Sequence, residues 1–127
     1  MSNIAIYAFI GLGGAMGACS RYFITQLMSD WLGKDFPFGT LLVNITGSFL
    51  LGLLYAMFEH EWLNAFPWRE LIGIGMLGAL TTFSTFSIDT LLLLQQGAWG
   101  KAILNMILNL GCCLLMAWLG MQVIKGN

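Results

Sequence analysis

Five hydroxyl side chains and two aromatic rings lie within seven consecutive residues near the middle of the chain, at positions 81–87. The segment reads Thr-Thr-Phe-Ser-Thr-Phe-Ser and stands inside an apolar stretch that runs from Leu71 to Leu94. Lipid offers no hydrogen-bond partner to a hydroxyl group, so such a cluster should face protein, water or an ion. Glycines at positions 73, 75 and 78 precede it and weaken helical order. A polar cluster beside a helix break is typical of an ion site in a membrane.

The two aromatic residues of this segment have chemistry that suits a small anion. Phe83 and Phe86 are three residues apart, so they share one face of a helix. Two rings that only pack against neighbouring helices would show the same spacing. An aromatic ring also has a positive edge, and two such edges can solvate an anion without a full charge that would trap it. Asn44 could add an N–H donor, and several weak contacts are what conduction requires.

The glycine-rich stretch Gly73-Ile-Gly-Met-Leu-Gly78 is a second candidate ion site. If it unwinds, backbone carbonyls such as those of Gly78 and Thr81 are left without partners. Carbonyl oxygens are ligands that suit a small hard cation, and Na⁺ is the cation we expect here.

Other apolar runs also carry small and polar residues at helical spacing. Gly13 and Gly17 form a face that allows close helix contact, and Arg21 continues it. Arg21 either snorkels to the membrane surface or is a buried cation that attracts anions or caps helix carbonyls. Two further runs carry neutral polar stripes: Thr40, Asn44 and Ser48, and Asn105, Asn109 and Cys113. These either join helices or, with the hydroxyl cluster, line a water-filled path. Asp89, inside the third run, is interpreted as lying at a helix end or at the membrane interface.

The elements that must position these residues are membrane spans. Of the 127 residues, 58% are hydrophobic and only 9% are charged, whereas a soluble domain carries about 25% charge. The mean hydropathy is +0.82. Four runs with almost no charge reach the roughly 20 residues that a bilayer core requires. They predict an all-α membrane protein with one domain, 1–127, and transmembrane helices over approximately 4–28, 37–58, 68–95 and 98–124, the third broken near its middle.

The charges leave the orientation of these spans open. With both termini on one side of the membrane, Arg69 and Lys125 lie opposite Lys34 and Lys101, with Arg21 near the end of the first span. Two cations against three is hardly a positive-inside bias. Either five cations give a noisy count, or copies insert both ways and pair as an antiparallel, dual-topology homodimer. Four helices are few for enclosing a pathway, which favours a dimer.

Several function classes are disfavoured. No nucleophile–base pair or metal-ligand set is visible, so we expect no enzyme activity. A drug/proton antiporter of similar size needs a carboxylate in its first span, and residues 4–28 contain none. An accessory helix bundle would explain the glycines but not the hydroxyl–aromatic cluster. No segment resembles a cleavable signal peptide, and we expect no nucleic-acid partner.

The motifs resemble those of the Fluc family of fluoride channels, also called CrcB. The resemblance covers essentially the whole chain, and its motifs come in order: Gly13-Gly14-x-x-Gly17-x-x-x-Arg21-Tyr22, then Gly39-Thr40-Leu41-x-x-Asn44-x-x-Gly47-x-Phe49, then Gly78-x-x-Thr81-Thr82-Phe83-Ser84-Thr85-Phe86-Ser87. The third motif is highly specific. The resemblance implies an antiparallel, dual-topology homodimer with two fluoride pores. Such a channel would sit in the lipid of the bacterial plasma (inner) membrane and confer fluoride resistance by passive efflux.

The resemblance also implies how fluoride would cross. Fluoride would enter a vestibule near Arg21, shed water onto Asn44 and nearby hydroxyls, and pass the positive edges of the pore phenylalanines, Phe83 and Phe86. A narrow pore that demands strong hydrogen bonds would discriminate against chloride.

Two further sets of residues take roles only through the resemblance. Backbone carbonyls of Gly78 and Thr81 from both subunits would hold a structural sodium ion at the dimer centre. The hydrogen-bonding track for fluoride would be extended by polar residues of the second, third and fourth spans: Thr40, Ser84, Thr85, Asn105, Asn109 and Cys113.

Overall fold

The computed structural model describes residues 2–125, and within this range all regular structure is helical. Four helical segments are long and apolar enough to cross a membrane: Asn3–Leu32, Phe38–Glu59, Ala65–Gln95 and Trp99–Ile124. The four predicted spans are therefore confirmed, with small shifts at their ends. The largest shift is in the first helix, which continues to Leu32 and stops at Gly33. Gly33 has φ 83°, a conformation that ends a helix readily because glycine has no side chain.

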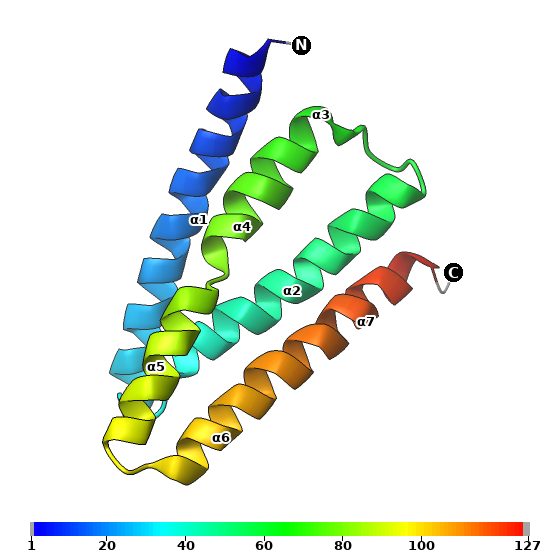
Figure 1. Ribbon diagram of the computed structural model, residues 1–127. Coiled ribbons are helices and arrows are strands. Elements are labelled where there is room, and N and C mark those ends of the chain that lie inside the picture. The colour runs from blue at the N-terminus through cyan, green and yellow to red at the C-terminus, as the bar shows by residue number, and fades with distance from the viewer. Residues whose placement is uncertain (1, 126–127) are drawn as a thin grey trace.

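Two of these spans are single helices and two are composite (Figure 1). The first two spans are the single helices α1 (Asn3–Leu32) and α2 (Phe38–Glu59). The third consists of α3 (Ala65–Trp68), the π-helix η1 (Arg69–Leu77), α4 (Gly78–Leu80) and α5 (Phe83–Gln95). The fourth consists of α6 (Trp99–Ile107), the π-helix η2 (Leu108–Cys112) and α7 (Cys113–Lys125). The side chain of Lys125, counted above in the charge balance, lies outside the described part of the chain.

Glycines bring α1 into close contact with the first half of the third span. A carbon added at Gly13 would overlap the carbonyl oxygen of Leu71, and one added at Gly17 would overlap that of Met76. The two helices therefore meet backbone to backbone, as the small-residue face of the first span indicates. This contact places Arg21, one turn beyond Gly17, beside the end of α4.

A second pair of glycine contacts joins α2 to α7, which run side by side (Figure 1). A carbon added at Gly52 would overlap the carbonyl oxygen of Ala117, and one added at Gly120 would overlap that of Phe49. The polar face of α2 is thereby held against the fourth span, where Asn44 reaches Asn109 of η2.

The helical path of the third span is interrupted between α4 and α5. Thr81 has φ −83° and ψ 155°, and Thr82 has φ −153° and ψ 122°, so both are extended. The glycine-rich stretch before them does not unwind, because residues 69–77 stay helical as wide π-turns. The unwinding expected at the glycines therefore lies a few residues later. Thr82 starts the next helix, since its Oγ1 accepts a hydrogen bond from the N–H of Thr85 at 3.2 Å.

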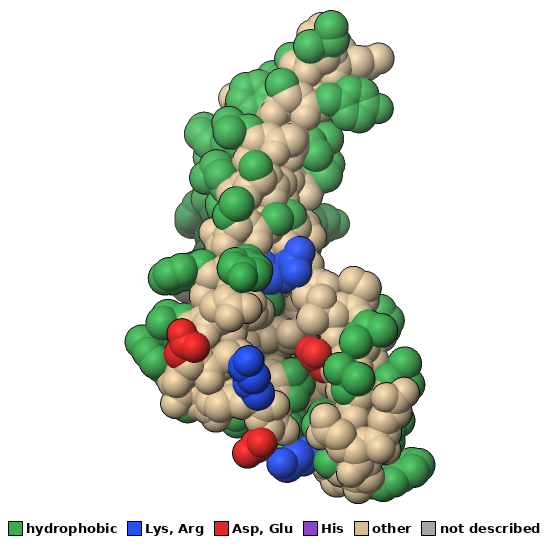
Figure 2. Space-filling view, turned by 90° about the vertical axis from the view of Figure 1, so that its left-hand side faces the viewer, with side chains coloured by type: hydrophobic (Ala, Val, Ile, Leu, Met, Phe, Trp, Pro, Cys, Tyr) green, Lys and Arg blue, Asp and Glu red, His purple; other side chains and the backbone are tan. Residues whose placement is uncertain are grey.

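The exterior of the molecule is apolar over most of its area. The buried apolar cluster is small, consisting of Val43, Leu54, Leu77 and Leu80, whereas large apolar side chains are exposed along every span. Such a surface suits contact with lipid or with another membrane protein. Figure 2 shows one face, with apolar side chains over its upper part and charged ones around a hollow in its lower half.

Candidate functional site

Asn44 holds the backbone at the interruption of the third span. Its Oδ1 accepts a hydrogen bond from the N–H of Thr82 at 2.8 Å, and its Nδ2 donates to the carbonyl oxygen of Thr82 at 3.1 Å. The side-chain amide thus gives the N–H of Thr82 the partner that a continuous helix would have supplied, and it adds a second donor to the C=O, which also starts α5. The second N–H of Nδ2 donates to Oδ1 of Asn109 at 2.9 Å. Both donors of Asn44 are therefore used within the chain.

The two phenylalanines occupy the first turn of α5, directly after this interruption. The ring centroids of Phe83 and Phe86 are 5.2 Å apart, and the ring planes are inclined by 58°. The rings touch, as their three-residue spacing indicates. Phe86 is 7% exposed and Phe83 is 70% exposed. One ring is therefore packed inside the chain, while the other forms part of its outer surface.

Arg21 reaches the interruption from the opposite side. Its Nε donates to the carbonyl oxygen of Ala79, in the last turn before the interruption, at 3.0 Å. Of the alternatives open at the sequence level, Arg21 therefore caps a helix carbonyl. The guanidinium also lines a polar cavity, so its positive charge is available to an anion there.

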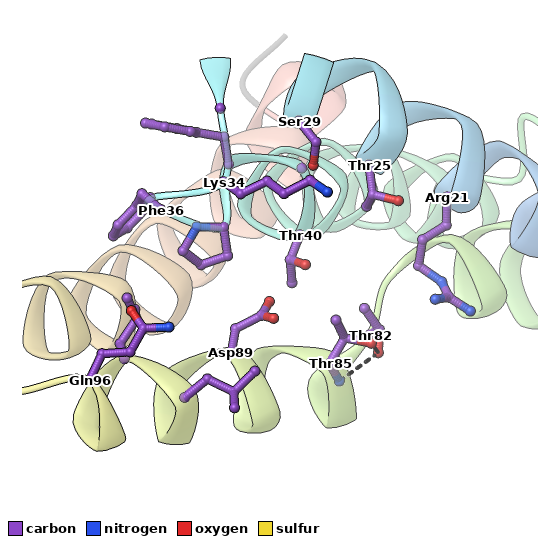
Figure 3. Close-up of a pocket in the computed structure, with 16 residues that line it drawn as sticks. Arg21, Thr25, Ser29, Lys34, Phe36, Thr40, Thr82, Thr85, Asp89 and Gln96 are labelled. Atoms are coloured by element: carbon purple, nitrogen blue, oxygen red, sulfur yellow. Dashed lines mark hydrogen bonds between the residues drawn. The ribbon is translucent and has the colours of Figure 1, made fainter. Parts of the chain in front are cut away.

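This polar cavity has a volume of about 310 Å³ and lies between α1, α2 and α5 (Figure 3). We call it the entrance cavity. It collects three of the predicted pathway residues, Arg21, Thr40 and Thr85. Other polar residues of its lining come from the same helices and from the connections at their ends: Thr25, Ser29, Lys34, Thr82, Asp89 and Gln96.

Two charged residues of the entrance cavity, Lys34 and Asp89, were not among the predicted pathway residues. Asp89 lies near the middle of α5 and not at a helix end, and its carboxylate points toward Thr40 (Figure 3). Its Oδ2 is buried and lacks a hydrogen-bond partner among residues 2–125. Helical spacing signals this position, because Asp89 follows Thr85, another residue of the cavity lining, by four residues. Lys34 lies in the loop after α1, where no periodicity indicates which way a side chain points.

A second cavity, of about 300 Å³, lies beside the phenylalanines, between α2, α5 and the fourth span. We call it the phenylalanine cavity. It brings together Asn44, Phe83, Phe86 and Asn109, which come from three spans. Ser48, Thr81, Leu110, Cys113 and Leu114 complete its lining with Thr82. Thr82 lines both cavities and so marks the boundary between them.

The remaining predicted residues lie close to this boundary. Ser84 lines neither cavity, and its hydroxyl oxygen is 3.3 Å from Oγ1 of Thr82. The hydroxyl of Thr81 donates to the carbonyl oxygen of Leu77 at 3.1 Å. Gly78 is exposed. In a continuous helix its carbonyl would accept from the N–H of Thr82, but Asn44 takes that N–H instead. The carbonyl oxygen of Gly78 is thus left without its helical partner.

Comparison with known proteins agrees with the resemblance that the motifs suggest. Residues 8–121 match the family described as CrcB-like protein, Camphor Resistance (CrcB). The chain is 57% identical to the fluoride-specific ion channel FluC of Vibrio vulnificus over 125 residues, covering 98% of this chain and 99% of the relative. It is 54% identical to the protein of the same name from Alteromonas mediterranea over 124 residues, 98% of each chain. For the Vibrio cholerae relative the identity is 51% over 118 residues, covering 93% of this chain and 94% of the relative.

The extent of these matches decides the family. They run over nearly the full length of both partners, and the family match includes the three motifs on which the resemblance rests. The relatives are named as ion channels, which agrees with the expectation that this protein is not an enzyme. We conclude that this multi-pass membrane protein belongs to the CrcB family.

Proposed function

We propose that the protein is a fluoride-specific ion channel through which fluoride leaves the cell passively, across the bacterial inner membrane, and that it thereby confers fluoride resistance. The observation that carries the proposal is that Phe83 and Phe86 lie together at one cavity. The polar side chains that line this cavity beside them are all uncharged. Ring edges and neutral dipoles attract an anion weakly, which permits binding and release. The names of the relatives support fluoride as that anion.

Different residues contact fluoride at successive points of the proposed path. Fluoride is attracted into the entrance cavity by Arg21 and Lys34 and exchanges water for the hydroxyls of Thr40 and Thr85. It then passes Thr82 and the hydroxyl of Ser84, and reaches the ring edges and Asn109 in the phenylalanine cavity. Chloride is disfavoured because it forms weaker hydrogen bonds and is larger. Asn44 does not donate to fluoride, because both N–H groups of its amide already donate to Thr82 and Asn109. It contributes by holding the Thr82 peptide in place.

The working channel is an antiparallel homodimer with two pores, and the surface of one chain supports this proposal. Phe83 and Gly78 are exposed, and the phenylalanine cavity opens to the outside of the chain. Hydroxyls and free carbonyls facing lipid would be unfavourable, so a second copy is needed to cover them. An antiparallel arrangement agrees with the near balance of cations on the two sides of the membrane.

A structural sodium ion at the centre of this dimer fits the residues present. The carbonyl of Gly78 lacks its helical partner, and a carbon added at Gly78 would meet nothing closer than 3.5 Å, so its backbone is accessible. With Thr81 it offers two oxygen ligands per chain, and two chains would offer four. When bound, the ion would neutralise these carbonyl dipoles and so hold the two interruptions together. Replacing Na⁺ by N-methylglucamine during purification should therefore lower the thermal stability of the dimer.

Fluoride release from liposomes tests the proposed function. Purified protein is reconstituted in liposomes loaded with potassium fluoride, valinomycin is added, and fluoride is followed with an electrode, with chloride-loaded liposomes in parallel. Fast fluoride release without chloride release is the expected result. If an intact dimer releases no fluoride, the proposed function is wrong.

The aromatic edges are tested by the variants Phe83→Ile and Phe86→Ile. Each keeps an apolar side chain of intermediate size but has no ring edge, so fluoride release should slow sharply while the dimer still assembles. Phe23→Ile is the matched control, because Phe23 is exposed on α1 and lines neither cavity. Normal release by both pore variants would contradict the role of the rings.

A further inference from the structure

Four buried polar side chains form one continuous hydrogen-bonded chain between α2, the fourth span and α5. From Asn44 the chain passes to Asn109 at 2.9 Å, and Nδ2 of Asn109 donates to Oδ1 of Asn105 at 2.9 Å. Nδ2 of Asn105 donates to Oγ1 of Thr90 at 3.0 Å, and the Thr90 hydroxyl donates to the carbonyl oxygen of Phe86 at 2.8 Å. All four side chains are buried. We call this set the amide chain.

The direction of every hydrogen bond in the amide chain is determined by backbone groups at its two ends. The single proton of the Thr90 hydroxyl goes to the carbonyl of Phe86, so Thr90 can only accept from Asn105. Asn105 must then present its carbonyl oxygen to Asn109. At the other end, the N–H of Thr82 requires the carbonyl oxygen of Asn44, which turns the Asn44 amide nitrogen toward Asn109. The two ends agree on one orientation of all three amides.

Both ends of the amide chain also attach to the same turn of helix. One end binds the N–H and C=O of Thr82, immediately before Phe83, and the other binds the C=O of Phe86. The turn that carries both rings is therefore fixed at its start and at its end. Asn105 is the middle member that joins the two halves, through Asn109 on one side and Thr90 on the other.

We propose that Asn105 is a positioning residue for fluoride conduction. It is 0% exposed and lines neither cavity, so it does not touch the ion. Its Oδ1 accepts a hydrogen bond from Asn109, which keeps Oδ1 of Asn109 turned toward the amide nitrogen of Asn44. Asn44 in turn fixes the Thr82 peptide. Without the Asn105 side chain, Nδ2 of Asn109 keeps only its hydrogen bond to the backbone carbonyl oxygen of Asn105, at 3.0 Å, so the Asn109 amide is held less firmly and the clamp on the phenylalanine turn loosens. The inference rests on the proposed function, because its effect is expressed as a fluoride rate.

The variants Asn105→Leu and Thr90→Val, alone and combined, test this inference. Asn105→Leu removes the middle link and should slow fluoride release about tenfold or more, because two buried partners, Thr90 and Asn109, each lose a hydrogen bond. Thr90→Val leaves the link from Asn105 to Asn109 intact and should slow release only about threefold. Since Thr90 reaches Asn44 only through Asn105, the double variant should be no slower than Asn105→Leu alone. Thr46→Val is the matched control, an exposed threonine on α2 whose hydroxyl makes no hydrogen bond within residues 2–125.

Reconstitution at low protein density separates positioning from loss of folded protein. The fraction of liposomes that release fluoride reports the number of active dimers, and the time constant reports the rate of each dimer. A positioning role lengthens the time constant at an unchanged fraction. A fraction that falls at an unchanged time constant, or independent multiplication of the two single effects, would overturn it. If Asn105→Leu does not fold, Thr90→Val decides alone: a wild-type time constant then overturns the inference. Failure of the wild-type protein to conduct would instead count against the proposed function.

Discussion

Replacing Asn44 by leucine should strongly slow fluoride release without preventing insertion of the protein. Asn44→Leu keeps a branched side chain of similar length but takes a hydrogen bond from three groups: the N–H of Thr82 and Oδ1 of Asn109 lose their partner, and the C=O of Thr82 loses one of its two donors. A buried polar group that loses its partner costs about 1–3 kcal/mol. Hydrogen bonds between membrane helices are often weaker, at about 0.6 kcal/mol and at most about 1.7. We therefore take about 1 kcal/mol for each group, or about 3 kcal/mol in all.

If this penalty falls on the conducting conformation, the rate should drop by about two orders of magnitude, because about 1.4 kcal/mol corresponds to a factor of ten. The assay is fluoride release from liposomes at low protein density, with the time constant of release as the readout. Thr46→Val, on the exposed face of the same helix, again serves as the control. A time constant for Asn44→Leu within about threefold of the wild type would refute the argument, since it would mean that the Thr82 peptide holds its position without the amide.

Three other substitutions test separate parts of the structure. Gly17→Ala places a carbon against the carbonyl of Met76 and should reduce the yield of assembled protein on gel filtration, whereas Gly100→Ala, where nothing lies within 4 Å, should not. Arg21→Gln removes a positive charge from the entrance cavity, so fluoride release should slow several-fold at low ionic strength and less at high salt, while Lys101→Gln, outside both cavities, should have little effect. Asp89→Asn removes the negative charge from the same cavity and should speed release at low salt; slower release would assign Asp89 an attractive or structural role instead.

The four spans were predictable because apolar runs of the length of a bilayer are a local property of the sequence. The close packing at Gly13 and Gly17 was predictable for the same reason, since a small-residue face needs no knowledge of its partner. The location of the helix interruption was not. The low helix propensity of glycine predicts an interruption at residues 73–78, but the residues with extended backbone are Thr81 and Thr82. They are extended because Asn44, 38 positions earlier in the chain, binds the Thr82 peptide. A contact of that range leaves no signal in either segment alone.

In the candidate site, too, local spacing was predictable from the sequence, whereas features that depend on long-range packing were not. Helical spacing correctly places Phe83 beside Phe86, and the same spacing places Asp89 on the face of Thr85, where both line the entrance cavity. Of the two uses of asparagine that the sequence leaves open, the structure shows the joining of helices, while the lining of a path stays a prediction. Asn105 is fully enclosed and joins helices, whereas Asn109 also borders the phenylalanine cavity. Burial separates these roles, and burial depends on the packing of all four spans.

The boundary between the two cavities has a property that matters for how such a pore can change. The Asn44 side chain binds only the backbone N–H and C=O of Thr82. The location of the boundary therefore does not depend on the side chain at position 82. A serine there would keep the hydroxyl that caps α5 and remove only one methyl group. The width of the proposed passage could thus be altered separately from its location. For evolution or for protein engineering, position 82 is a place where preference among anions of different size can be adjusted in small steps while the architecture around it stays the same.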